Sequence, residues 1–80
     1  MTVGEAMRRR IVQLCEEHDI SFNKLGNISG VTQSTINNIV SGRNNSATVS
    51  TIKKLCDGLG ITLGEFFSTP EFDTLEQEIK

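Results

Sequence analysis

"GVTQSTINNIVSGR", residues 30–43, begins with a glycine and continues as a short polar segment with few charges. Gly30 can adopt the left-handed conformation that ends a helix, and Thr32 is a favourable N-cap for the next one. Ile36 and Ile39 lie three residues apart, which is the spacing of one buried helical face. The stretch therefore predicts a turn followed by an amphipathic helix.

The face of this helix that points away from the two isoleucines carries amides and hydroxyls. At about 100° per residue, this face contains Gln33, Ser34, Asn37 and Asn38. Asn and Ser are poor helix formers, so helix propensity does not explain their presence. Gln and Asn can bond bidentately to adenine in the major groove, and Ser can bond to either kind of base edge. The pattern indicates a surface that contacts DNA.

The distribution of charge agrees with this interpretation, although the 80-residue chain has a formal net charge of −2. Residues 20–56 contain no Asp or Glu, whereas residues 70–80 carry four acids and one base. The bases of the acid-free segment are Lys24, Arg43, Lys53 and Lys54. An acid-free segment with four positive charges is suited to a polyanion, and the chain's net charge conceals it.

Two helices are predicted before the turn. Apolar residues with a 4-4-3 spacing predict a first helix over about residues 4–18, ended by Asp19. Ser21 is the predicted N-cap of a short second helix, with Leu25 and Ile28 facing inward. The first helix places Val3, Met7, Ile11 and Leu14 on one face.

Gly42 is predicted to end the helix that contains Ile36 and Ile39. Two further helices are predicted after it. Thr48 caps a fourth helix that Gly60 closes. Thr62 and Glu65 form a capping-box pattern that opens a fifth helix. The fifth helix runs through Phe66 and Phe67, and we expect one of these two residues in the core and the other partly exposed. The apolar stripe of the fourth helix consists of Val49, Ile52, Leu55, Cys56 and Leu59.

The acidic C-terminal segment is expected to be separate from the domain that precedes it. Pro70 marks the boundary, so we expect a domain over 1–69 and a tail over 70–80. Phe72, Leu75 and Ile79 have the i, i+3, i+7 spacing that is compatible with a sixth helical segment. These three residues could bind a partner protein, pair two copies of the chain, or pack on the domain itself.

The stretch "FNKLGNISGVTQSTINNIVSGR", residues 22–43, resembles the lambda-repressor-like, Xre-type helix-turn-helix of phage repressors and Cro proteins. "TVSTIKKLCDGLGITLGEFF", residues 48–67, resembles the fourth and fifth helices of that family. The resemblance implies an all-α fold with five helices around one core. The positions that match the family pattern are Gly26, Gly30, Val31, Thr32, Ile36, Ile39 and Gly42.

The resemblance also implies how the residues would bind double-stranded DNA. The third helix would lie in the major groove, with Gln33, Ser34 and Asn38 reading bases and Asn37 at the groove wall. The loop after it and the start of the second helix would hold phosphates, since a helix N-terminus offers free N–H groups and a positive dipole end. The phosphate-binding residues would be Asn23, Lys24, Arg43, Asn44 and Asn45.

Other chemistry has little support in the sequence. The single histidine, the lack of a nucleophile with an adjacent base and the absence of a phosphate loop argue against an enzyme. Cys15 and His18 alone do not make a zinc site, so we expect no metal and no cofactor. Two cysteines without a secretory signal suggest core residues in a cytoplasmic protein, and no apolar run is long enough for a membrane span.

We therefore expect a cytoplasmic transcriptional regulator from a bacterium or its phage, and a repressor in particular. The alternative is a protein-interaction module on the same fold, such as an antitoxin. A homodimer is expected because one short helix reads few base pairs. The apolar surface for pairing would combine Phe66 or Phe67 with the tail. We expect Arg8, Arg9 and Arg10 to form a solvated face of the first helix rather than DNA contacts.

Overall fold

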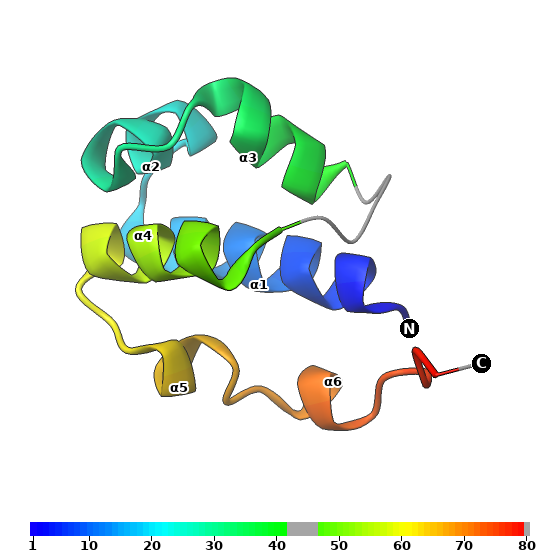
Figure 1. Cartoon of the computed structure of the whole chain (residues 1–80). Coiled ribbons are helices and arrows are strands. Elements are labelled where there is room, and N and C mark those ends of the chain that lie inside the picture. The colour runs from blue at the N-terminus through cyan, green and yellow to red at the C-terminus, as the bar shows by residue number, and fades with distance from the viewer. Residues whose placement is uncertain (42–46, 80) are drawn as a thin grey trace.

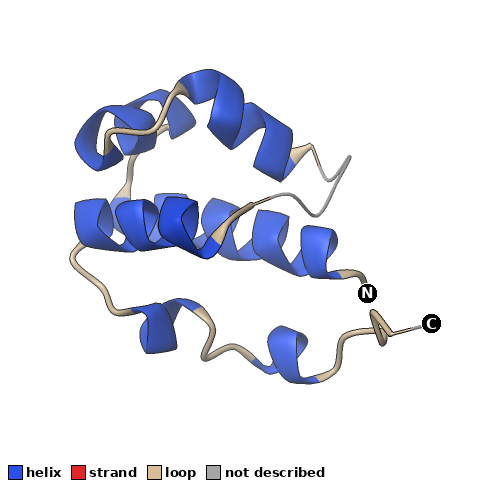
Figure 2. Cartoon of the chain, in the orientation of Figure 1, coloured by secondary structure: helices blue, strands red, loops and turns tan. Residues whose placement is uncertain are grey.

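The structure is a computed structural model that describes residues 1–41 and 47–79. Every regular element in these residues is a helix, which confirms the predicted all-α class (Figure 2). The helices are α1 (Val3–His18), α2 (Phe22–Ser29), α3 (Gln33–Val40), α4 (Val49–Leu59), α5 (Leu63–Phe66) and α6 (Pro70–Asp73).

The first five helices each begin with a hydroxyl side chain that accepts a hydrogen bond from a backbone N–H three residues on. The predicted caps are confirmed at α2 through α5, and Thr2 supplies the cap of α1. At α5 the Glu65 carboxylate also accepts from the Thr62 N–H, which completes the capping box. Each capping side chain accepts a hydrogen bond from a backbone N–H that has no partner inside the helix. The start of each of these helices is therefore fixed by residues that are close in sequence. The four predicted caps are Ser21, Thr32, Thr48 and Thr62.

The helices form three layers, as Figure 1 shows. α1 and α4 lie in the middle, α2 and α3 cover one side, and α5 and α6 lie on the other. The packing partners agree, since α2 contacts α4, α3 contacts α1, α5 contacts α4 and α6 contacts α1. The C-terminal segment therefore lies on the opposite side of the domain from α3.

The core is aliphatic except for one aromatic ring. Phe66 is fully buried, as are Ile36 of α3 and Leu55 of α4, while Phe67 is 39% exposed. This confirms that one phenylalanine of the pair belongs to the core. Cys15 and Cys56 are buried free thiols, and burial raises the pKa of both. The remaining buried apolar residues are Ala6, Met7, Ile11, Leu14, Leu25, Ile39, Ile52 and Leu59.

Two predictions about the helical faces are wrong. Ile28 was expected to face inward from α2, but its side chain is 39% exposed, because α2 turns Leu25 and Gly26 toward the core. Val49 was placed in the apolar stripe of α4, but it is 71% exposed. It is the first residue of α4, and the buried residues of this helix begin one turn later, at Ile52.

Arg10 is buried, so the prediction that three consecutive arginines form a solvated face is wrong for this residue. Its exposure is 8%, and its guanidinium donates from Nε to the Phe66 carbonyl oxygen at 2.6 Å. Nη2 donates to the Glu65 carbonyl oxygen at 2.7 Å, and Nη1 donates to Gln13 Oε1 at 2.7 Å. Arg10 thus satisfies two carbonyls at the end of α5 and ties that end to α1.

The C-terminal segment packs on the domain through one aromatic residue. The Phe72 ring lies 5.0 Å from the Phe67 ring and 6.2 Å from the Phe66 ring, measured between centroids. Beyond it, the Glu76 N–H donates to the Met1 carbonyl oxygen at 3.2 Å. The sixth helical segment exists as α6, but it ends at Asp73, before the other apolar residues of the tail.

The corner between α2 and α3 depends on Gly26. A Cβ atom at this position would lie 2.7 Å from the Val31 carbonyl oxygen and 3.3 Å from Ile36 Cδ1. The Val31 N–H donates back to the Gly26 carbonyl oxygen at 3.1 Å, so the turn lies directly against α2. Gly30 ends α2 with a φ of 68°, as predicted. Gly26 therefore allows α3 to start close to α2 and sets where α3 lies.

We expect Gly26→Ala to destabilise the domain by up to about 2 kcal/mol. Alanine favours a helix interior by about 1 kcal/mol, but the added methyl must displace a backbone oxygen, and such overpacking costs about 1–3 kcal/mol. Gly64→Ala is the matched control, because its Cβ would meet only Thr62 Oγ1, at 3.8 Å. That substitution should be neutral or stabilising. Urea unfolding of both variants measures the difference, and equal effects would contradict the close approach at Gly26.

Candidate nucleic-acid interface

The four predicted base-reading residues lie together on the exposed side of α3. Gln33, Ser34, Asn37 and Asn38 are all exposed. Within the described part of the chain, their side chains make no hydrogen bond, so their amides and hydroxyl are open to an external partner. Polar side chains on one helical face without internal partners are suited to pairing with the edges of bases.

The opposite side of α3 fixes this surface to the domain. Ile36 is fully buried and Ile39 is 6% exposed, as their spacing predicts. Thr32 Oγ1 accepts from the Thr35 N–H at 3.2 Å and bonds to Thr35 Oγ1 at 2.9 Å. Thr32 is therefore a cap, in agreement with the sequence analysis. A rigidly held helix presents its exposed side chains in one register, which base recognition requires.

The start of α2 places the next predicted contacts at the surface. Asn23 and Lys24 are exposed residues of its first turn, and Ser21 Oγ accepts from the Lys24 N–H at 3.1 Å. None of α2, α3 and α4 has an acidic residue in its first turn, whereas α1 and α5 each have one and α6 has two. The positive ends of the three middle helices are therefore not neutralised by a local carboxylate.

The remaining predicted phosphate-binding residues, Arg43, Asn44 and Asn45, lie outside the described residues, as does Gly42. Of the two α4 lysines, Lys53 forms an ion pair with Asp57. The hydrogen bond to Asp57 and its negative charge raise the pKa of Lys53. Lys54 is exposed and has no carboxylate within ion-pair distance among the described residues, so it is the more available cation.

The described residues offer little for other chemistry. In 1–41 and 47–79, no three His, Cys, Asp or Glu side chains lie close enough together to hold a metal ion. Among the same residues, no helix combines the length and apolar character needed to cross a bilayer. The exposed face of α3 is thus the surface whose residue types point to a definite kind of partner.

The sequence matches the Cro/C1-type HTH DNA-binding domain over residues 10–71. The chain belongs to the Cro/C1-type HTH DNA-binding domain family. This confirms the resemblance noted from the turn and the helices that flank it. The helix-turn-helix that the sequence predicts corresponds to α2, the turn at Gly30 and α3.

Two curated relatives of the chain are transcriptional regulators by name. The chain is 34% identical over 68 residues to the HTH-type transcriptional regulator PuuR of Escherichia coli (strain K12), and equally to the regulator of that name of Shigella flexneri. The match covers 85% of this chain and 36% of each relative. The chain therefore spans about a third of the length of these relatives.

A solved structure has the same fold over nearly its whole length. The crystal structure of the prophage Lp1 protein 11 superposes on this chain with a TM-score of 0.80 and 30% sequence identity. The match covers 90% of this chain and 95% of that protein. Both the architecture and the family therefore agree with the expectation of a lambda-repressor-like domain.

Proposed function

We propose that the protein is a sequence-specific regulator, and a repressor in particular, that reads the major groove of double-stranded DNA with α3. The observation that carries this proposal is the exposed face of Gln33, Ser34, Asn37 and Asn38 on a helix anchored from behind by Ile36. The PuuR relatives, which are transcriptional regulators, support the regulatory role.

The proposed contacts divide into two kinds. Gln33, Ser34 and Asn38 read base edges, and Asn37 lies at the groove wall. The phosphates are bound by the first turn of α2 and by the segment after α3, through Asn23, Lys24, Arg43, Asn44 and Asn45. Phosphate contacts supply affinity and register, and base contacts supply specificity. Binding should weaken as salt rises, with a log–log slope of about −0.9 for each phosphate neutralised.

We expect Gln33→Ala and Asn38→Ala each to relax the preference at particular base pairs by about 1–3 kcal/mol, because each removes a bidentate donor–acceptor pair. Selection of bound fragments from random DNA gives the preferred duplex, and competition with single-base variants gives the preference. Neither variant should lower the urea midpoint, since both side chains are exposed.

Arg43→Ala is the control for this experiment. Loss of a phosphate contact weakens all duplexes alike and makes the salt slope shallower, without changing the preferred bases. The proposal would be abandoned if selection enriched no sequence at moderate salt. Unchanged preferences in both α3 variants would place base reading elsewhere.

We also propose that two copies bind a two-fold symmetric site, with half-sites about 34 Å apart, one helical turn of DNA. The tail lies on the far side of the domain from α3, so pairing there would leave the proposed reading face open. Ile79, which is 88% exposed, and Phe67 offer apolar area for such pairing.

Deletion of residues 74–80 should therefore weaken dimerisation and operator binding together, as measured by sedimentation with and without the duplex. This truncation keeps Phe72, whose ring contacts Phe66 and Phe67. The domain of residues 1–69 should therefore stay folded, with an unchanged helical signal in circular dichroism. An intact chain that stays monomeric on its duplex would contradict the proposed dimer. A truncated chain that still dimerises would move the interface off the tail.

A further inference from the structure

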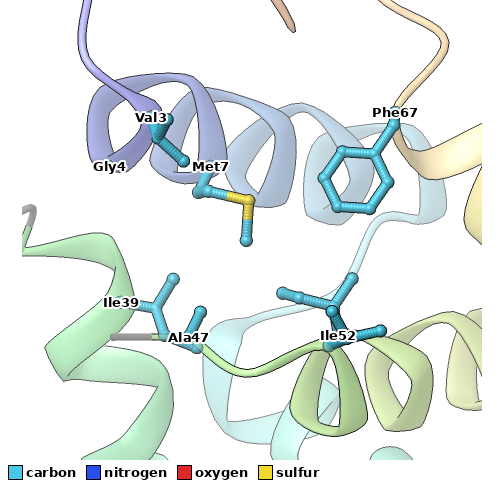
Figure 3. Close-up of a pocket in the computed structure, with 8 residues that line it drawn as sticks. Val3, Gly4, Met7, Ile39, Ala47, Ile52 and Phe67 are labelled. Carbon is cyan, nitrogen blue, oxygen red and sulfur yellow. The ribbon is translucent and has the colours of Figure 1, made fainter. Parts of the chain in front are cut away.

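An apolar cavity of about 140 Å³ lies where the start of α1, the end of α3 and the start of α4 meet. Figure 3 shows Val3 and Met7 of α1, Ile39 of α3 and Ile52 of α4 around a common space, which the Phe67 ring closes on one side. The described residues that line the cavity do not include the exposed amides and hydroxyl of α3 or the first turn of α2.

The lining defines the chemistry of a ligand. Among the residues that the structure describes, every side chain around the cavity is apolar, and none offers an N–H or O–H group. A polar group placed inside would lose its hydrogen bonds to water without replacement. An engineered apolar cavity of about 150 Å³ in another protein is known to take up benzene. The cavity thus has the size for one six-carbon ring or a short aliphatic chain.

The mouth of the cavity permits entry from solvent. Val49 and Phe67 belong to the lining, and they are 71% and 39% exposed. A ligand can therefore enter without opening the core, and any polar end that it carries can remain in water. This feature distinguishes the cavity from an enclosed packing defect.

We propose that this cavity binds a small uncharged apolar molecule, and that its occupancy strengthens DNA binding. A bound ring would touch Ile39 of α3, Met7 of α1 and Ile52 of α4 at once. It would therefore add contacts that hold the C-terminal end of α3, beyond Ile36, against α1 and α4. A segment already held in place loses less conformational entropy on binding DNA. The coupling to DNA rests on the proposed function of α3, whereas the site itself does not.

Titration of the full chain with benzene, followed through its methyl resonances, tests the site. We expect saturable shifts at Met7, Ile39 and Ile52, and a rise in the melting temperature with benzene concentration. Ala47→Leu, which fills the cavity from its rim, should weaken benzene binding at least tenfold. Val49→Thr tests the same rim with a polar group at an exposed position, where folding is not at risk, and should weaken binding severalfold.

Ile28→Val is the matched control, because Ile28 lies on α2 outside the cavity, and it should leave benzene binding unchanged. Shifts that never saturate, or that spread over the whole core, would overturn the site. The site would also be overturned if the same methyl resonances shifted with protein concentration in the absence of benzene. Such shifts would mean that a second copy of the chain occupies the cavity.

Measurement of duplex affinity with and without saturating benzene tests the coupling. We expect benzene to tighten the selected duplex at least twofold, and the duplex to tighten benzene by the same factor, since coupling between two sites is reciprocal. Saturable benzene binding without this change would overturn the coupling. If no duplex is bound specifically, the proposed function fails, and the methyl titration still decides the site by itself.

Discussion

Replacement of Arg10 by alanine is expected to lower the free energy of unfolding by about 3–5 kcal/mol. The substitution removes the guanidinium hydrogen bonds to the Phe66 and Glu65 carbonyl oxygens, and a hydrogen bond to a charged group contributes about 1.5–3 kcal/mol. It leaves the buried Phe66 oxygen without the Arg10 donor, whereas the Glu65 oxygen still accepts from the Ser68 hydroxyl at 2.9 Å. The apolar stem of Arg10 is lost as well, which removes packing between α1 and α5. Urea unfolding followed by circular dichroism gives the value.

The neighbouring arginine provides the control for this prediction. Arg9 is exposed on the same helix, so Arg9→Ala should change the free energy of unfolding by less than about 0.5 kcal/mol. Arg10→Lys should fall between the two, since an ammonium cannot donate to both carbonyls in the planar geometry of a guanidinium. Similar losses for Arg9 and Arg10 would show that charge alone, and not the bonds to α5, stabilises this part of the fold.

The helices could be predicted because their boundaries are set by local interactions. Ser21, Thr32, Thr48 and Thr62 each accept from an N–H three residues away, which a short sequence window contains completely. The turn at Gly30 depends on the conformational freedom of that residue alone. The family resemblance then supplied the arrangement of these helices in space, which the spacing of apolar residues by itself does not.

The errors concern contacts between residues that are distant in the chain. Arg8, Arg9 and Arg10 are three consecutive residues of the same type, so the local sequence does not distinguish them. The carbonyl oxygens that accept hydrogen bonds from Arg10 lie more than 50 residues away in the chain. The spacing of apolar residues also does not show which of them another helix covers. For this reason the spacing alone assigns Val49 to the buried face of α4, although it is 71% exposed. Phe72 could have packed on its own domain or on a partner, and the choice depends on two rings that only the folded chain brings together.

The candidate site was predictable in the part that depends on local sequence. The exposed face of α3 follows from helical geometry and from the two isoleucines behind it. The role of Gly26 was not predictable from composition, because it arises from the approach of the Val31 carbonyl oxygen across the turn. The apolar cavity was equally hidden, since its walls come from α1, α3, α4 and the residue after α5.

Ile36→Ala is expected to cost about 2–5 kcal/mol of folding free energy, the range for deletion of a buried isoleucine side chain. Ile36 is fully buried, and its Cδ1 atom lies on the side of α2 where Gly26 has no side chain. The cavity left behind would open between α2 and α3, at the corner that positions the reading helix. Because small domains have a total stability of about 5–15 kcal/mol, this loss is large enough to leave a measurable unfolded fraction near physiological temperature.

Asn37→Ala is the matched control, because Asn37 is the next residue of α3 and is exposed. Alanine is the better helix former, so the urea midpoint should stay the same or rise. The pair separates anchoring from reading: Ile36→Ala should lose stability and operator affinity together, whereas Gln33→Ala should lose base preference at unchanged stability. An Ile36→Ala variant with the urea midpoint of the unaltered chain would mean that α3 is held mainly by Ile39 and the Thr32 cap. The rigid register on which the proposed base reading depends would then have to come from those two contacts.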